Sequence, residues 1–341
     1  MENTPKPTAH PSHIEDFDQW NTLKNTSRTF YLSIKQLPTK IGNAFCLAYL
    51  LLRVSDFFED NEFMPPEEKV YWLNTWDEVL AGQPFPEDWQ VKLKDFASKD
   101  PDAFAAFYAD ELLNLVSLLP AGLQKKIVPL VQATTRGMAR WVARGPVVLQ
   151  EEDMDDYMFE VAGRVGYLST EVFAWYSKAI KNRQDLLMPL AEETGLALQT
   201  VNILRGLRKD YDRGWIYVPE SYCELAGINR GELFSSENEE KILKLVELLA
   251  DKAERHLTSA LDYIKFIPPH QHKVRLACIW PLMFAARTIS VSRNNLGVLK
   301  GTAKVSRDEI KQIIQVTTLF GWSNRFLKSY YEKLLRAPAN H

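Results

Sequence analysis

The chain has 341 residues, of which 46% are hydrophobic and 25% are charged, a composition typical of a globular protein. Its formal net charge of -3 offers no positive surplus for nucleic acid, so we expect no nucleic-acid partner. The three cysteines (Cys46, Cys223 and Cys278) are far apart and form no CxxC pair, which argues against a disulfide framework or zinc site and favours a reducing cytoplasm.

The first 17 residues lack the basic and apolar regions of a signal peptide, and we predict that they form a disordered tail. Across residues 18–341, apolar residues recur at spacings of three and four, while alternating strand patterns are almost absent. Prolines and turn clusters separate the helical segments, but no long linker divides the chain. The pattern therefore predicts one all-α domain over residues 18–341.

Two apolar runs are candidate membrane spans, residues 44–52 ("AFCLAYLLL") and residues 276–286 ("LACIWPLMFAA"). Each is shorter than the roughly 18 to 20 apolar residues that cross a bilayer. We therefore expect buried core helices and no transmembrane segment. Peripheral contact with a membrane stays open.

The first apolar run leads directly into a cluster of acids in the stretch "YLLLRVSDFFED". On a helix, Asp56, Glu59 and Asp60 share one face, which Tyr49 and Arg53 extend upstream. Carboxylates beside a buried apolar run are costly without partners, and cations would supply them. Magnesium accepts one or two carboxylates and completes its shell with water and phosphate. The stripe is thus consistent with a Mg²⁺-diphosphate site, and equally with a solvated helix end.

A second polar stripe follows the apolar stretch "ETGLALQTVNILRG". Gln199, Asn202, Gly206 and Asp210 lie at helical spacing, with Arg205 beside them. Amides on the inner face of an apolar helix need partners, which a polar ligand or the core itself could provide. If both stripes faced one apolar cavity, metals could hold a diphosphate there while apolar walls sheltered a carbocation.

Near the C-terminus, the stretch "NNLGVLKGTAKVSRDEI" contains Lys300, Lys304 and Arg307. From residue chemistry alone these side chains form a solvated basic loop before a helix that begins near Ser306.

Five segments together resemble the squalene/phytoene synthase family. In chain order, "SRTF" (27–30), "YLLLRVSDFFED" (49–60), "YMFEVAGRVG" (157–166) and "LQTVNILRGLRKDYDRGWIYVP" (198–219) look like its successive signatures. The segment at 294–310 is similar to the asparagine pair and KGxxK stretch of squalene synthases, more than to phytoene synthases. The resemblance implies an all-α isoprenoid synthase (class I terpenoid synthase) bundle around a central hydrophobic cavity.

The resemblance also implies an activity. Family members join two prenyl diphosphates head to head through a cyclopropyl intermediate. A squalene synthase uses Mg²⁺ to condense two farnesyl diphosphates to presqualene diphosphate, which NADPH then reduces to squalene.

Site residues are carried over from the family motifs position by position. The acids matching the two metal boxes are Asp56, Glu59, Asp60 and Asp210. The residues matching contacts to diphosphate or its hydrated metals are Ser27, Arg28, Arg53, Gln199, Asn202 and Arg205. The tyrosines matching positions near the reacting carbons are Tyr49 and Tyr157, and the basic residues associated with NADPH are Lys300, Lys304 and Arg307.

Two positions depart from the family pattern. Gly206 stands where an aspartate is expected and supplies no ligand. Asp212 cannot replace it, because two residues along a helix is about 200° around the axis. Trp215 occupies the family's basic position, with Arg213 two places earlier as a candidate substitute for diphosphate binding.

The departures leave several activities open. Water, Asn202 or an acid such as Glu171 could complete the metal shell of a working squalene synthase-like enzyme, which we favour because the first acidic stripe, the tyrosines and KGxxK remain. Condensation without reduction would give dehydrosqualene or phytoene. With fewer metals, the chain could act on one substrate as a terpene synthase or prenyltransferase, or bind prenyl diphosphate without catalysis.

Overall fold

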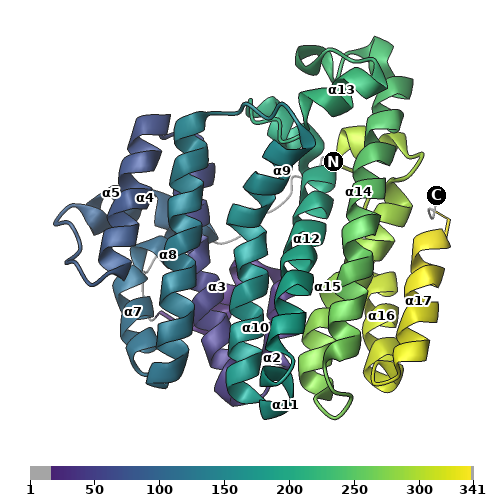
Figure 1. Cartoon of the computed structure of the whole chain (residues 1–341). Helices are drawn as coiled ribbons and strands as arrows, with labels where there is room; N and C mark the ends of the chain where they lie inside the picture. Colours follow the sequence, from purple (N-terminus) through teal and green to yellow (C-terminus); the bar gives the residue numbers. More distant parts are fainter. Residues whose placement is uncertain (1–16, 339–341) are drawn as a thin grey trace, which may run out of the picture.

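A computed structural model describes residues 17–338, which are helical with short connections and contain no strand (Figure 1). The all-α prediction is therefore confirmed for these residues. The tail prediction falls mainly on residues 1–16, which lie outside the described part. The assignment of residues 18–341 to a single domain stays an interpretation.

The first half of the chain contains α1 (Gln19–Thr26), α2 (Arg28–Lys35), α3 (Thr39–Asp60), α4 (Pro66–Leu80), α5 (Trp89–Ala97), α6 (Pro101–Phe107), α7 (Ala109–Ser117), α8 (Ala121–Arg144), α9 (Glu151–Met158), the π-helical turn η1 (Phe159–Gly163) and α10 (Arg164–Tyr176). The second half contains α11 (Lys178–Lys181), α12 (Gln184–Asp212), α13 (Glu220–Ala226), η2 (Arg230–Glu232), η3 (Ser236–Asn238), α14 (Glu239–Phe266), α15 (His272–Ser292), η4 (Leu296–Lys300), α16 (Arg307–Phe320) and α17 (Asn324–Arg336). The capping box of Ser306 and Glu309 confirms the helix start predicted near Ser306.

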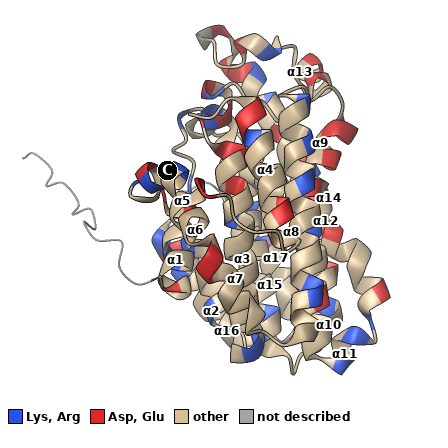
Figure 2. Ribbon diagram, turned by 90° about the vertical axis from the view of Figure 1, so that its left-hand side faces the viewer, with Lys and Arg blue, Asp and Glu red and all other residues tan. Residues whose placement is uncertain are grey.

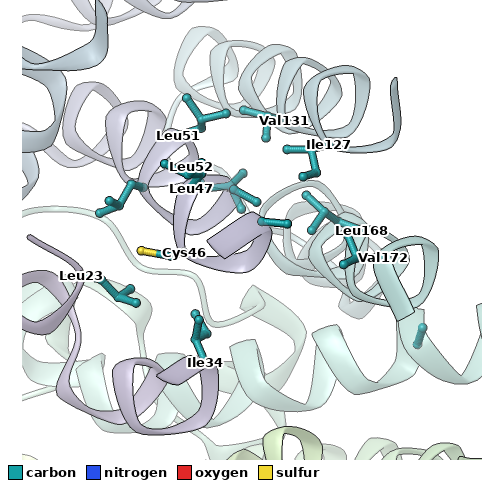
Figure 3. Close-up of a cluster of buried hydrophobic side chains, with 14 of the residues drawn as sticks. Leu23, Ile34, Cys46, Leu47, Leu51, Leu52, Ile127, Val131, Leu168 and Val172 are labelled. Carbon is teal, nitrogen blue, oxygen red and sulfur yellow. The ribbon is translucent and has the colours of Figure 1, made fainter. Parts of the chain in front are cut away.

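The two apolar runs lie in α3 and α15, at the centre of the bundle. By length and composition both helices could cross a membrane, but 78% and 83% of their apolar windows are buried inside the protein. Figure 3 shows leucines of α3 beside Ile127 and Val131 of α8 and Leu168 and Val172 of α10. The hydrophobicity of α3 is thus used in packing, as expected, and the cytoplasmic location stays a prediction. All three cysteines are free.

Two glycines bring η1 and α10 against α12. A Cβ at Gly166 would lie 2.0 Å from the carbonyl oxygen of Ala191, and one at Gly195 would lie 2.3 Å from that of Ala162. Any side chain would therefore separate the backbones. This close crossing fixes α12 beside the segment that carries Tyr157.

The two ends of the helical bundle are held together by different contacts. The C-terminal ends of α3 and α12 are joined by Arg213, which contacts both Asp60 and Asp210. At the opposite end, the Gln36 side chain donates to the carbonyl of Lys273, which connects the α2–α3 turn to the start of α15. The candidate site lies between these ends.

Candidate active site

A cavity of about 440 Å³ lies among α2, α3, α10, α12, α14 and α15. One end is acidic and polar, with Arg53, Asp56, Glu59, Asp60, Gln199, Asn202, Asp210 and Arg213 in its lining. The remaining wall is largely apolar, and includes Phe30, Ile34, Leu37, Phe45, Leu52, Val165, Phe173, Leu198, Leu257 and Pro281. The two predicted acidic stripes therefore meet at one end of an apolar cavity.

The acids of α3 are buried and close to one another. Burial raises the pKa of Asp56 to about 6, although Arg53 opposes the shift. Burial, followed by the neighbouring charges of Asp60 and Asp56, raises the pKa of Glu59 well above its usual range. These groups resist ionisation chiefly because burial disfavours their charged forms. A bound cation would favour the charged forms.

Arg53 is already held by two carboxylates. Its Nη1 donates to Asp56 Oδ2 at 2.6 Å, its Nε donates to Asp102 Oδ1 at 2.8 Å, and its Nη2 also pairs with Asp102. Burial alone would lower the pKa of Arg53, but Asp56 and Asp102 raise it well above its usual value. Asp102 lies in the first turn of α6, and no feature of the sequence signalled its role. The pair fixes the guanidinium beside Asp56.

Asp210 and Asp60 share one cation across the mouth of the cavity. Arg213 Nη1 lies 2.8 Å from Asp60 Oδ1, and its Nη2 lies 3.0 Å from Asp210 Oδ1. Burial raises the pKa of Asp210 to about 6, with Arg213 lowering it and Asp60 raising it. The sequence analysis predicted Arg213 only as a substitute for the family's basic residue at position 215. In the structure its side chain links the two acid-bearing helices.

Gly206 leaves an opening beside this pair. It lines the cavity, and a Cβ built there would lie 3.0 Å from Asp210 Oδ2, the end of a flexible side chain. Asn202 also lines the cavity and donates to Gln199 Oε1 at 3.3 Å. Asp212 instead pairs with Arg208 at 2.9 Å. It does not line this cavity, in agreement with its angular position on the helix.

Aromatic rings cover the wall next to the acids. Tyr157 stacks on Tyr217 with 4.4 Å between their ring centroids. Trp215 also stacks on Tyr217, with 5.9 Å between the centroids. Burial first, then the charge of Glu59, raises the pKa of both tyrosines well above the usual value, so both stay neutral. Tyr49 lies farther along the lining beside Phe30. The sequence analysis missed Tyr217, although it falls within a quoted family segment.

Other predicted residues lie outside the lining of this cavity. Ser27 caps α2 by accepting from the Phe30 amide at 3.3 Å, and it forms a hydrogen bond with Tyr49. Arg28 and Arg205 are exposed, and their substrate roles stay predictions.

The suggestion that Glu171 completes a metal shell is wrong. This side chain pairs with Lys126 and accepts from Gln184 Nε2 at 2.6 Å. It does not line the cavity.

The three basic residues associated with NADPH are exposed. Lys300, Lys304 and Arg307 do not line the cavity. Lys300 ends η4, which packs against α12, the helix that carries Asp210. The basic segment therefore contacts the helix that carries Asp210 but does not itself line the cavity.

The donor set fits magnesium bound together with a diphosphate. Within residues 17–338, no three metal-ligating side chains form a ready-made metal cluster. Asp56, Asp60 and Asp210 nevertheless present carboxylates to one cavity. Because Mg²⁺ takes only one or two carboxylates and completes its shell with water and phosphate, a protein-only cluster is not required.

The sequence matches the profile of the squalene/phytoene synthases over residues 23–309. It is 26% identical over 311 residues to an inactive squalene synthase 2 of Arabidopsis thaliana, covering 87% of this chain and 70% of the relative. It is 27% identical over 300 residues to a squalene synthase of Schizosaccharomyces pombe, covering 86% and 63%. The chain thus spans roughly two thirds of the length of these relatives.

Solved structures share the fold. A complex described as TcSQS with the ligand E5700 superposes with a TM-score of 0.80 at 21% identity, covering 93% of this chain and 90% of the other. A dehydrosqualene synthase bound to a ligand gives a TM-score of 0.65 at 20% identity, with coverage of 92% and 95%. At these identities the likeness establishes the isoprenoid synthase fold.

Proposed function

The chain belongs to the squalene/phytoene synthase family, and we propose that it condenses two farnesyl diphosphates to presqualene diphosphate and reduces this product to squalene with NADPH. The observation that carries the proposal is the meeting of Asp56, Asp60 and Asp210 at one end of an apolar cavity. A prenyl diphosphate has the matching shape, with a charged head for the acidic end and a hydrocarbon tail for the apolar wall.

The acidic end would bind the diphosphate of the first substrate. Asp56, Asp60 and Asp210 would hold Mg²⁺, which supplies positive charge to the departing diphosphate when it is bound. Arg53 and Arg213 add fixed positive charge at the same end. Gly206 offers no carboxylate, so one expected metal ligand is missing. Arg213 supplies part of the positive charge that metal ions would otherwise bring to Asp60 and Asp210.

The apolar wall would protect the cation that forms when the carbon–oxygen bond breaks and diphosphate takes the electron pair. A double bond of the second farnesyl diphosphate supplies the electrons of the new carbon–carbon bond, and loss of a proton closes the cyclopropane. Tyr157 and Tyr217 present neutral aromatic rings beside this end, where a cation is attracted to a ring face. The apolar part of the lining would also keep out water, which would otherwise capture the cation.

The reductive step depends mainly on the family resemblance. Lys300, Lys304 and Arg307 could bind the phosphates of NADPH, and η4 lies against α12. In this proposal the carbon–oxygen bond of presqualene diphosphate would break with the second diphosphate taking the electron pair, and the cyclopropane would rearrange to an open cation. NADPH held by these residues would supply the hydride that converts this cation to squalene.

A second candidate is a prenyl-diphosphate binder without catalysis. Gly206 removes one expected ligand, and Arg213 already pairs with the two remaining acids at the mouth. These observations favour weaker metal binding at the second stripe.

Product analysis separates the candidates. Purified protein is incubated with Mg²⁺ and farnesyl diphosphate, with and without NADPH, and pyrophosphate and hydrocarbons are measured. Squalene formed only with NADPH supports the proposal, whereas dehydrosqualene or phytoene without reduction assigns the carotenoid branch. A C15 product indicates single-substrate chemistry. Absence of pyrophosphate with prenyl diphosphates of every length tested would identify a binder.

A further inference from the structure

The end of the bundle opposite the acids carries a concentration of positive charge. We name it the basic end face and define it by α11, the α2–α3 turn (36–38), the α14–α15 turn (267–271) and the α16–α17 turn (321–323). Figure 1 shows α11 and the last two turns together at the lower end of the bundle. The face is distinct from the predicted catalytic and cofactor residues.

Hydrogen bonds between distant segments hold this face together. Gln36 Nε2 donates to the Lys273 carbonyl at 2.6 Å, and Arg183 Nη1 donates to the Phe266 carbonyl at 2.7 Å. Arg275 Nε donates to the Gly321 carbonyl at 3.2 Å, which joins α15 to the α16–α17 turn. The turns therefore form one continuous surface.

The exposed charges on and beside the face are mostly positive. The exposed cations are Lys40, Lys178, Lys181, Arg183, Lys273 and Arg325. Among the same segments, Asp185 is an exposed acid, while Asp262 pairs with Lys265 at 2.8 Å. This excess contrasts with the net charge of -3 of the whole chain. Figure 2 shows blue segments near α11 and α16, and red segments around α9 and α13 at the other end.

Large apolar side chains accompany these cations at the α16–α17 turn. Leu319, Phe320 and Trp322 are 66%, 49% and 55% exposed. Leu186, at the start of α12 beside α11, is 47% exposed. Exposed aromatic and aliphatic side chains surrounded by cations are typical of proteins that sit at the surface of a bilayer containing anionic lipid.

The apolar part of the cavity reaches this same end. Ile34 and Leu37 line the cavity, while Gln36 between them takes part in the basic end face. Tyr263 also lines the cavity three residues before the end of α14, which is about 4.5 Å along a helix. Only the α2–α3 turn and the neighbouring helix ends therefore separate the apolar wall from the face.

We propose that the basic end face docks on an anionic lipid surface, with Phe320 and Trp322 inserted among the lipid headgroups. Docking concerns the surface alone and does not depend on the proposed chemistry. If that chemistry also holds, a hydrocarbon product would leave the apolar end of the cavity into lipid without crossing water.

Vesicle sedimentation with the full chain and no substrate tests the proposal. We expect binding to vesicles of equimolar phosphatidylcholine and phosphatidylglycerol, little binding to phosphatidylcholine alone, and release at high salt. Equal binding to both vesicle types, or to neither, would overturn the proposal.

Charge variants locate the contact. Replacing Lys178 and Lys181 with Gln should lower the vesicle partition coefficient by about 30-fold, at roughly 1 kcal/mol per lysine. The matched control replaces Lys241 and Lys244, which are exposed at the start of α14 near the acidic end, and should leave binding unchanged. Equal losses in both pairs would refute this face as the contact. If circular dichroism shows misfolding of the first pair, the variant K273Q/R325Q takes its place.

An aromatic variant separates lipid from a protein partner. Trp322→Ser should lower the partition coefficient about tenfold, while Phe63→Ser, which removes an 83% exposed ring at the opposite end, should not. Sedimentation velocity without lipid should show the same monomer for both variants and the parent chain. A dimer that Trp322→Ser dissolves would assign the face to a second copy and overturn the lipid proposal.

Discussion

The two acid-bearing helices differ in how their carboxylates are neutralised. On α3, Asp56 pairs with Arg53 one helical turn away, and Asp102 of α6 holds that arginine from the other side. On α12, Asp210 pairs with Arg213, which also reaches Asp60 on α3. Asp56 therefore has an arginine of its own, whereas Asp210 shares Arg213 with Asp60 across the mouth of the cavity.

The difference shows how the chain accommodates Gly206. An aspartate there would add a carboxylate beside Asp210, and both would need metal. With glycine, Asp60 and Asp210 share the positive charge of Arg213, and the pKa of Asp210 still rises to about 6. We therefore propose that the ion pair of Arg213 takes the place of part of the metal binding that an aspartate at position 206 would add.

The largest effect is expected from the first acidic stripe. Asp56→Ala should lower the rate of pyrophosphate release by about 1,000-fold, because it removes a charge that would orient a metal at the leaving group. Far-ultraviolet circular dichroism should show unchanged helicity. Glu171→Ala is the control, and it should retain normal turnover because Glu171 lies outside the cavity lining. Near-normal turnover of Asp56→Ala would remove Asp56 from the metal site.

Arg213 tests the contact between the stripes. Arg213→Gln should lower pyrophosphate release by about 10- to 100-fold, since it leaves Asp60 and Asp210 without their shared cation. It should also raise the number of Mg²⁺ ions bound per chain, measured by titration calorimetry with inorganic pyrophosphate. Arg208→Gln changes the same charge near the end of α12 but outside the cavity, and serves as the control. Unaltered Mg²⁺ binding by Arg213→Gln would contradict the exchange of ion pair for metal.

The sequence predicted those parts of the site that depend on local geometry. The positions of Asp56, Glu59 and Asp60 on one face follow from helical spacing, and all three line the cavity. The bridge from Arg213 to Asp60 spans 153 residues, and the bond from Arg53 to Asp102 spans 49. Such contacts depend on how helices pack.

The same limit explains what the helical pattern left unspecified. The helical pattern predicted an all-α chain because amphipathic periodicity is a local signal. It could not distinguish the π-helical turn η1 from an ordinary helix, or show that Glu171 faces Lys126 instead of the cavity. The close crossing at Gly166 and Gly195 likewise became visible only when α10 and α12 were placed side by side.

The raised pKa values of Asp56 and Asp210, each about 6, predict opposite responses of stability and activity to pH. The folded chain binds these protons more tightly than the unfolded chain, whose aspartates titrate near pH 3.9. Without Mg²⁺, its free energy of unfolding should therefore rise by roughly 2 to 3 kcal/mol from these two groups as pH falls from about 7 to about 5. Pyrophosphate release should fall over the same range, because metal binding requires ionised carboxylates.

The double variant Asp56→Asn with Asp210→Asn is the reference for this pH experiment. Urea unfolding at each pH gives the difference in stability between the two proteins, so titration of other groups cancels. A difference that does not change between pH 5 and pH 7 would show that neither carboxylate has a raised pKa.

The smallest effect is expected at Gly206, where the family pattern has an aspartate. Gly206→Asp should lower the Mg²⁺ concentration for half-maximal pyrophosphate release by about two- to fivefold, since it restores a carboxylate at the cavity wall. The gain is small because the new Cβ lies 3.0 Å from Asp210 Oδ2, which must turn aside, and because Arg213 already pairs with Asp210. Gly206→Asn, which has nearly the same shape without the charge, should show no such gain. Combining Gly206→Asp with Arg213→Gln should enlarge the Mg²⁺ effect, because the restored acid then has no competing arginine. If the double variant responds to Mg²⁺ no more strongly than Gly206→Asp alone, Arg213 and the absent aspartate are independent features, and the ion pair is not the reason that glycine is accommodated.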